Sequence, residues 1–225
     1  MHAGFAMLET GSVTKTSVAD IMFTNVSTIS IGVIFYWFFG YGFAYGSSEG
    51  ASKFIGTRSF MGRFPNKEFD KALWFFQMVF AAAAATIVSG AVAGRIKLSA
   101  YFVVAGLLTA LVCPVVTHWI WATGGCLSAF TPVEVLFTLI GQKEPCEMVD
   151  FAGSGVVHMI GGVAAFWGAF ILGTRENWSP GAYPPYNYPL ATLGTFILWF
   201  AWNGVNAGHV TITTTFSSAA SCIMG

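Results

Sequence analysis

Charge is scarce in this chain of 225 residues, because only 9% of them are Asp, Glu, Lys or Arg. A soluble globular domain carries about 25% charged residues, which it needs to cover its water-facing surface. Hydrophobic residues make up 55% of the chain, and the formal net charge is zero. These values exclude an ordinary soluble domain and provide no basic surface for nucleic acid. They indicate an all-α bundle with several helices that span a membrane.

Motifs for metal or redox chemistry are also missing. The sequence contains no CxxC or HExxH pattern, and its four histidines are scattered, so we expect no metal and no cofactor. Cys113 lies in an apolar stretch and Cys222 near the end, whereas Cys126 and Cys146 share one long loop. A disulfide between these two is chemically allowed if the loop is extracellular, and two free thiols are equally compatible with the sequence.

Long stretches without charge locate the expected membrane spans. A helix needs about 20 apolar residues to cross about 30 Å of hydrocarbon. The first residues, 1–8, are apolar but too short to span, and they lack the basic segment of a signal peptide. We interpret them as the end of a helix, and we expect a piece of a longer protein. Five further spans are predicted near residues 21–46, 72–94, 99–121, 151–173 and 189–209.

The most informative run extends from Asp150 to His158 (DFAGSGVVH), at the start of the fourth of these ranges. It places the imidazole of His158 about a third of the way into a membrane helix. Ionisable side chains at such depth are costly and mark pathways or proton sites, although a purely structural hydrogen bond is the alternative. Asp150 precedes the helix, where an acid caps free N–H groups and favours the helix dipole.

Aromatic residues form a second pattern. Phe76 and Phe80 lie one turn apart, and Trp119 and Trp121 end the third expected span. Aromatic faces hold small cations, but interfacial Trp is also a common bilayer anchor, and Phe76 and Phe80 are equally able to face lipid. The last expected span adds His209 at its end.

Together, these stretches resemble the ammonium transporter family, which includes the methylammonium permeases and the Rhesus proteins. The matching segments occur in family order along nearly the whole chain, and the DFAGSGVVH run is the most specific of them. The resemblance covers the first half of a family member: the first inverted repeat of the fold plus one further helix. The segments are AGFAMLE (3–9), FQMVF (76–80), TIVSGAVAGR (86–95), DFAGSGVVH (150–158) and WNGVNAG (202–208).

The resemblance implies a role for each matching residue. Phe80 resembles the phenylalanine that gates the outer pore, and Phe76 lies near the same vestibule. Trp121 resembles the tryptophan that stabilises an arriving ammonium ion. Asp150 resembles the acid that organises the outer site, and His158 resembles the first of two paired pore histidines. The implied partners are ammonium or ammonia, the lipid bilayer, and two further copies in a homotrimer, with the plasma membrane as the expected location.

The chain departs from the family pattern at three positions. Val205 stands where phenylalanine is usual, His209 where serine is usual, and Gly94 where glutamate is usual. The first two bring the outer recruitment site into question. The second pore histidine belongs to a span after Gly225, so this chain contains half of the twin-histidine site.

The expected function is transmembrane transport of ammonium, not enzymatic catalysis. An aromatic outer vestibule would recruit the ion, and an apolar pore lined by histidine would favour neutral ammonia, because desolvation disfavours the charged form. One alternative is an ammonium sensor that binds without conducting, which the residues Val205 and His209 would suit. Another is a membrane electron carrier with haem held by His118 and His158.

Overall fold

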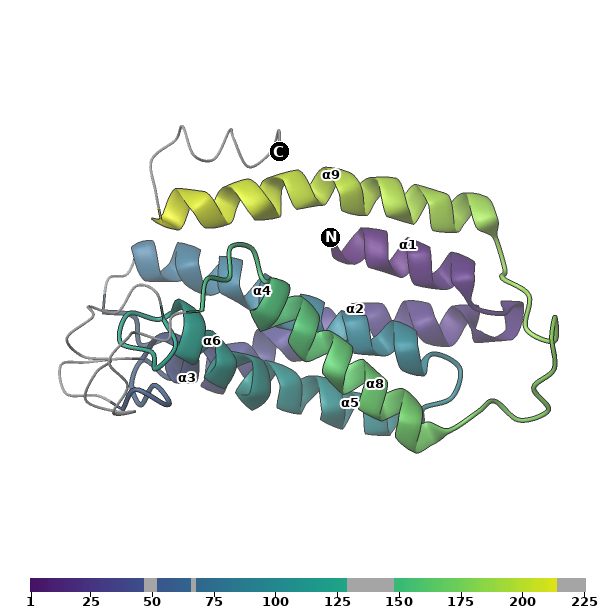
Figure 1. The fold of residues 1–225 in the computed structure, drawn as a ribbon, viewed down its shortest axis with the longest axis horizontal. Helices are drawn as coiled ribbons and strands as arrows, with labels where there is room; N and C mark the ends of the chain where they lie inside the picture. The colour runs from purple at the N-terminus through teal and green to yellow at the C-terminus, as the bar shows by residue number, and fades with distance from the viewer. Residues whose placement is uncertain (47–51, 66–67, 129–147, 214–225) are drawn as a thin grey trace.

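The computed structural model describes residues 1–46, 52–65, 68–128 and 148–213, with the side chains of residues 209–213 excepted. These residues form helices joined by loops, and their only β contact is one isolated bridge between Ser128 and Met148. The fold class predicted from the sequence, an all-α helix bundle, is therefore confirmed (Figure 1).

The described helices follow the expected order. A helix lies in the range 1–8 and in each of the ranges 21–46, 72–94, 99–121, 151–173 and 189–209. The α-helices are α1 (His2–Ser12), α2 (Val18–Phe35), α3 (Tyr41–Tyr45), α4 (Phe69–Val92), α5 (Leu98–Leu107), α6 (Cys113–Trp121), α8 (Ile160–Leu172) and α9 (Tyr188–Thr213).

Three π-helical segments join or extend these helices. Tyr36–Gly40 links α2 to α3, Leu108–Val112 links α5 to α6, and Ser154–Met159 leads into α8. Among the described residues, four continuous helices are long and apolar enough to cross a membrane: Lys15–Tyr45, Phe69–Val92, Leu98–Trp121 and Ser154–Leu172. The 26 residues of α9 give it a length of about 39 Å, yet it is not among these four by hydropathy.

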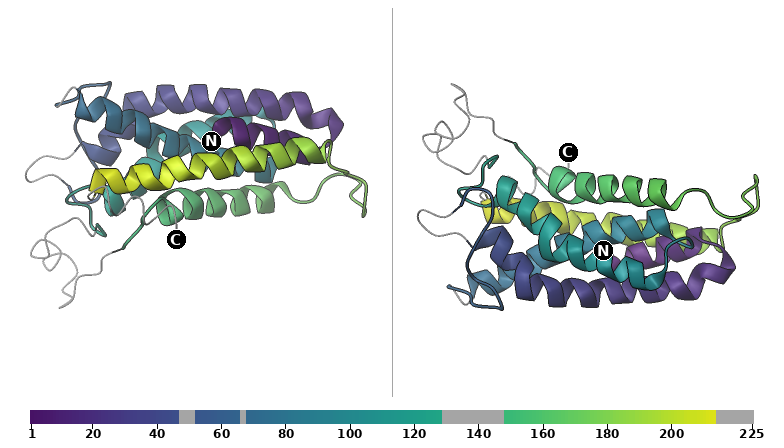
Figure 2. Two further views of the ribbon diagram at one scale, coloured as in Figure 1. Left: turned by 90° about the horizontal axis from the view of Figure 1, so that it is seen from above. Right: turned by 90° about the horizontal axis from the view of Figure 1, so that it is seen from below.

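Helix α4 forms the centre of the bundle. Its run of small residues, Ala81–Ala85, is buried, and three of these alanines have no exposed surface. Helix α8 packs along one side of α4 and α2 along another, while α1 packs against α9 (Figures 1 and 2). Small side chains permit such close packing of helices in lipid.

Glycines bring the backbones of α1 and α9 into direct contact. A Cβ atom at Gly11 would lie 2.4 Å from the backbone nitrogen of Ala191. A Cβ atom at Gly194 would lie 2.3 Å from the backbone nitrogen of Leu8. Neither position tolerates a larger residue unless the helices move apart.

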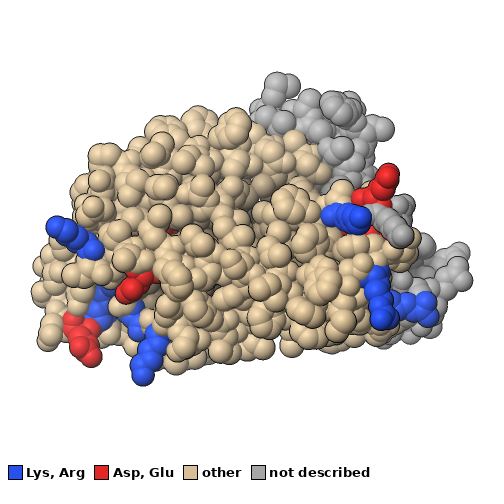
Figure 3. Space-filling view, turned by 180° about the vertical axis from the view of Figure 1, so that it is seen from behind, with Lys and Arg blue, Asp and Glu red and all other residues tan. Residues whose placement is uncertain are grey.

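The surface between the two ends of the bundle is apolar. Charged side chains lie toward the ends of the face in Figure 3, and a broad uncharged belt lies between them. Large hydrophobic side chains are exposed along the helices, among them Phe23, Val103, Phe166, Phe170 and Phe200. Such a belt suits lipid or a further protein surface and not water.

Candidate functional site

The carboxylate of Asp150 closes the turn that begins the His158 helix. Its Oδ1 accepts the backbone N–H of Gly153 over 2.8 Å and lies 3.2 Å from Ser154 Oγ. Its Oδ2 accepts the backbone N–H groups of Gly155 and Val156 over 2.9 and 2.7 Å. Because Asp150 is only 5% exposed, water replaces few of these bonds. The capping role predicted for Asp150 is therefore confirmed.

Two glycines make this cap possible. Gly153 has a φ of +96°, a region that side chains with a Cβ rarely adopt. A Cβ atom at Gly155 would lie 3.1 Å from Asp150 Oδ2, so glycine leaves the carboxylate room to approach the backbone. The two glycines in DFAGSGVVH thus serve the turn.

Three aromatic rings form a continuous row beside this turn. The ring centroids of Phe76 and Phe80 are 4.9 Å apart, and those of Phe80 and Trp121 are 5.4 Å apart. The indole N–H of Trp121 donates to the backbone carbonyl oxygen of Asp150 over 2.9 Å. Residues from α4, α6 and the turn before α8 thereby come together, although as many as 74 positions separate Phe76 from Asp150 in the sequence numbering.

His158 lies on the π-helical segment Ser154–Met159, one turn before the point where α8 packs tightly on α4. At that point a Cβ atom on Gly161 would be 2.9 Å from Ile87 Cβ. The His158 side chain is exposed in this chain. Single π-helical turns occur frequently at functional sites, and an exposed imidazole between apolar neighbours is free to contact a ligand or another span.

Two cavities open along one face of α4. The first, which we call the Phe80 cavity, holds about 240 Å³ and has an almost wholly apolar lining of Phe76, Val79, Phe80, Ala83, Ala201, Gly204 and Val205, with Met1 and Phe75. The second, which we call the Glu9 cavity, holds about 460 Å³. Its lining includes Thr86, Ile87, Gly90 and Ala91 of α4 and Phe5, Leu8 and Glu9 of α1. At 100° per residue, these α4 positions form one stripe, so the two cavities follow each other along the helix.

The structure places two of the three residues that depart from the family pattern, whereas the side chain of the third is not described. Val205 is half-buried and lines the Phe80 cavity, so a smaller side chain stands beside the Phe80 ring. Residue 209 belongs to α9, but the side chain of His209 lies outside the described part. Gly94 has a φ of +66°, and a Cβ atom there would lie 2.9 Å from Arg175 Nη1. The local backbone therefore favours glycine at this position.

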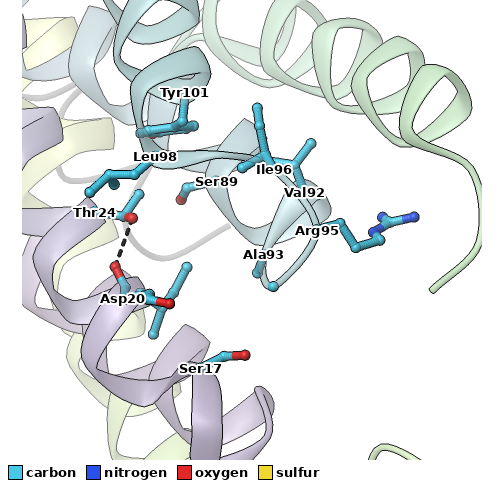
Figure 4. A pocket seen from close by; sticks show the side chains of 12 residues that line it. Ser17, Asp20, Thr24, Ser89, Val92, Ala93, Arg95, Ile96, Leu98 and Tyr101 are labelled. Carbon is cyan, nitrogen blue, oxygen red and sulfur yellow. Dashed lines mark hydrogen bonds between the residues drawn. The ribbon is translucent and has the colours of Figure 1, made fainter. Parts of the chain in front are cut away.

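A third cavity lies on another side of α4. It holds about 260 Å³ between the ends of α2, α4 and α5, and its lining includes Asp20, Thr24, Ser89, Arg95 and Tyr101 (Figure 4). None of the sequence-predicted site residues lines it. It is therefore separate from the row of rings and from the His158 helix.

His118 has a structural position. Its Nδ1 lies 2.8 Å from the carbonyl oxygen of Ala44 and its Nε2 lies 3.2 Å from that of Ser52, and the ring is 1% exposed. Both nitrogens face the backbone, so His118 is not placed to bind a haem iron together with His158. Within the described part, no group of three or more His, Cys, Asp or Glu side chains gathers to hold a metal ion.

The structure adds a polar cluster that the sequence did not single out. Glu9 is 8% exposed, and its carboxylate receives hydrogen bonds from Asn25 and Ser89, both over 2.8 Å. Asn25 and Ser89 lie 16 and 80 residues away along the chain.

Of the two cysteines in the long loop, Cys126 carries a free thiol in the structure, and Cys146 lies outside the described residues.

Comparisons with known proteins agree with this architecture. The family model described as Ammonium Transporter Family matches residues 1–224. The putative ammonium transporter 1 member 5 of Arabidopsis thaliana is 43% identical over 207 residues, which are 89% of this chain and 40% of that protein. The ammonium transporter Amt2 of Archaeoglobus fulgidus is 40% identical over 214 residues, which are 92% of this chain and 44% of that protein.

Solved structures show the same fold. A structure titled Sensor Amt Protein has 34% sequence identity and a TM-score of 0.77, covering 93% of this chain and 51% of its own. Mep2 of Saccharomyces cerevisiae has 22% identity and a TM-score of 0.74, covering 100% of this chain and 48% of its own, and it supports the fold alone. The chain spans less than half the length of the curated relatives named here, and it belongs to the ammonium transporter family.

Proposed function

We propose that the protein to which this chain belongs carries ammonium across a membrane, and that the aromatic row is where the ion is received. The observation that supports this most is the contact series from Phe76 through Phe80 and Trp121 to Asp150. Aromatic faces attract a small cation without the full desolvation cost of an ion pair, so they hold it for a short time. The buried carboxylate of Asp150 organises the turn beside them.

The stripe along α4 then provides a path. Below the rings, the Phe80 cavity is almost wholly apolar, which disfavours a charged species and favours neutral ammonia. His158, on the neighbouring helix, supplies an imidazole that accepts a hydrogen bond or relays a proton at low cost. The Glu9 cavity continues the stripe toward the opposite end of the bundle. In the orientation of the family, the ring end faces outward.

The exposed face that carries His158 is the natural contact for a second set of spans, including a second histidine. Family transporters build their site between inverted repeats.

We further propose a homotrimer in the plasma membrane, by resemblance to the family. The uncharged belt of the bundle is compatible with both lipid and neighbouring subunits.

The test is uptake of labelled methylammonium by cells that lack their own ammonium permeases and express the full-length gene. His158→Ala should reduce uptake at least about tenfold, which corresponds to about 1.4 kcal/mol in the barrier. Met159→Ala is the matched control, because Met159 is the exposed neighbour of His158 and carries no polar group. Uptake that survives His158→Ala unchanged would contradict the assigned pore.

A sensor is the second candidate, since a structure titled Sensor Amt Protein is 34% identical to this chain. Val205 widens the Phe80 cavity relative to the usual phenylalanine, which would suit an ion held in place. Ammonium-dependent signalling without uptake, in the same cells, would support the sensor and exclude the transporter.

A further inference from the structure

Glu9 differs from the other buried carboxylate of the described chain, Asp150. Three backbone N–H groups donate hydrogen bonds to the Asp150 carboxylate and stabilise its negative charge. From the residues that the structure describes, Glu9 receives no backbone N–H, and it is held by two neutral side chains, Asn25 and Ser89. A carboxylate buried in an apolar helix bundle is costly unless a positive group balances it, so its position needs an explanation.

The neighbours of Glu9 fix it in one orientation. Asn25 Nδ2 donates to Glu9 Oε2 and Ser89 Oγ donates to Glu9 Oε1, each over 2.8 Å. A Cβ atom at Gly90 would lie 3.3 Å from Oε1, so glycine leaves the carboxylate open on that side. The side chain is therefore anchored from two helices, and its remaining lone pairs point away from these anchors.

Asn25 leaves a second acceptor unused. Its amide nitrogen donates twice, to Glu9 Oε2 and to the carbonyl oxygen of Ile21 over 3.0 Å, which settles the orientation of the amide. Its Oδ1 is buried and has no hydrogen-bond partner among the residues that the structure describes. Asn25 itself is 2% exposed. Asn25 is not among the residues that line the Glu9 cavity, so the group that faces this cavity is the Glu9 carboxylate, which suits a small cation with several N–H donors.

The Glu9 cavity provides the space for such a ligand. It holds about 460 Å³, and Phe5, Leu8 and Ile87 contribute much of its apolar wall. Arg175 also lines this cavity, where its Nη2 donates to the carbonyl oxygen of Ala93 over 3.0 Å. Ser89 additionally borders the polar third cavity on the other side of α4 (Figure 4). Among the described residues that line the largely apolar Glu9 cavity, Glu9 is the acidic one and Arg175 is the basic one.

We propose that Glu9, held in place by Asn25 and Ser89, forms a second binding site for a small cation with N–H donors, the ammonium ion, at the far end of the path from Trp121. This inference rests on the proposed transport of ammonium, because it assigns the same ion to the same α4 stripe. An ion arriving from the apolar segment meets the carboxylate before it meets the guanidinium of Arg175. The carboxylate then stabilises its charge.

The proposed Glu9 site can be tested without measuring transport, by using charged thiol reagents to measure the local charge in the Glu9 cavity. Ser12 lines the same cavity one turn from Glu9, so Ser12→Cys in a cysteine-free full-length protein provides a reporter thiol. The probes are a trimethylammonium methanethiosulfonate and a sulfonate methanethiosulfonate, applied from the side of Arg95. Glu9→Gln should lower the ratio of cationic to anionic labelling rates by at least about tenfold, because one charge acts on two probes of opposite sign. Arg175→Gln should raise this ratio.

Ammonium itself identifies the ligand. Ammonium chloride should slow the cationic reagent at Ser12→Cys more than the same concentration of sodium chloride does, and Glu9→Gln should remove that difference. A labelling ratio unchanged by Glu9→Gln overturns the site, since Glu9 would then carry no charge into the cavity. Equal effects of ammonium and sodium overturn the assignment of an N–H cation.

Uptake by the full-length protein separates this inference from the proposed function. Glu9→Gln should reduce the maximal rate at least about tenfold and leave KM within about threefold, because the aromatic row is unchanged. Glu9→Asp should restore part of the rate. Thr10→Val is the control, because it alters a buried residue of the same turn without removing a carboxylate. A wild-type protein without uptake would overturn the transport function, while the labelling ratio would still decide the Glu9 site.

Discussion

The indole N–H of Trp121 donates to the backbone carbonyl oxygen of Asp150 over 2.9 Å. This single bond joins the end of α6 to the turn that begins the His158 helix. Since the Trp121 ring also packs against Phe80, the position of the aromatic row depends on the geometry of the Asp150 turn. Changes in the turn should therefore affect both stability and ion recruitment, whereas changes in the rings should affect mainly recruitment.

The carboxylate of Asp150 should be the strongest determinant of stability in this region. Asp150→Ala leaves the N–H groups of Gly153, Gly155 and Val156 without their acceptor. A buried donor without a partner costs about 1–3 kcal/mol, so we expect a loss of about 3–5 kcal/mol. Thermal unfolding of the full-length protein in detergent, followed by size-exclusion chromatography, measures the loss. Asp20→Ala, in the exposed first turn of α2, should change stability by about 0.5 kcal/mol.

Gly153 should resist even the smallest substitution. Gly153→Ala places a side chain at a φ of +96° and brings a Cβ atom to 2.7 Å from Val157 Cγ2. The backbone strain alone costs about 1–2 kcal/mol, and the apparent melting temperature should fall. Gly106→Ala is the matched control, because its new Cβ would meet the Phe35 ring at an ordinary 3.5 Å. Equal melting temperatures for the two variants would contradict the role assigned to Gly153.

The cap at Asp150 could be predicted from the sequence, but the number of its bonds could not. An acid before Gly and Ser at the start of an apolar run indicates an N-terminal cap. The left-handed conformation of Gly153 and the approach at Gly155 depend on how the turn meets Trp121, which is a tertiary contact. The same limit applies to the π-helical segments, because the apolar pattern changes little when hydrogen bonds shift by one residue.

Glu9 was missed because its partners are remote. The segment AGFAMLE contributed to the family resemblance, yet nothing local shows that Glu9 turns toward Asn25 and Ser89. His118 is the opposite case, since its sequence position allowed a haem ligand and the structure places both ring nitrogens against the backbone. For the aromatic row, the spacing of Phe76 and Phe80 was visible in the sequence. Their contact with Trp121 requires the packing of α4 against α6.

The Trp121 ring should act through its face and its N–H separately. Trp121→Leu removes the aromatic face, and a lost cation–π contact of about 0.5–2 kcal/mol should raise the KM for methylammonium about 2- to 30-fold. Trp121→Phe keeps an aromatic face but removes the bond to Asp150, so it should lower the melting temperature and raise KM less. If both variants raise KM equally, the N–H bond and not the ring face positions the ion.

Close packing of α1 on α9 should depend on Gly11. Gly11→Ala introduces a Cβ atom 2.4 Å from the backbone nitrogen of Ala191, which forces the two helices apart. Overpacking of this kind costs about 1–3 kcal/mol, and the melting temperature should fall accordingly. Ser12→Ala, at the exposed neighbouring position, should leave it nearly unchanged. An unaltered melting temperature for Gly11→Ala would show that α1 does not pack on α9 in the full-length protein.

The reactivity of Cys126 should reveal both its surroundings and its pairing. Burial raises the pKa of the Cys126 thiol above its ordinary value, which favours the neutral form. Only the thiolate reacts with iodoacetamide, so at pH 8 Cys126 should react more slowly than an exposed cysteine. The difference should shrink as the pH rises, because both thiols then ionise. Ser52→Cys supplies the exposed reference in a neighbouring loop.

The same measurement decides the open question about Cys146. In a protein that keeps only Cys126 and Cys146, slow alkylation without a reductant indicates a free, half-buried thiol. Alkylation that appears only after reduction indicates a disulfide, which would attach the far part of that loop to the segment after Trp121. Cys146→Ser separates the two cases, since it should free Cys126 for alkylation only if the two were bridged. Because Cys126 N–H donates to Lys53 O over 3.1 Å, a bridge would also restrain the loop beside the aromatic row.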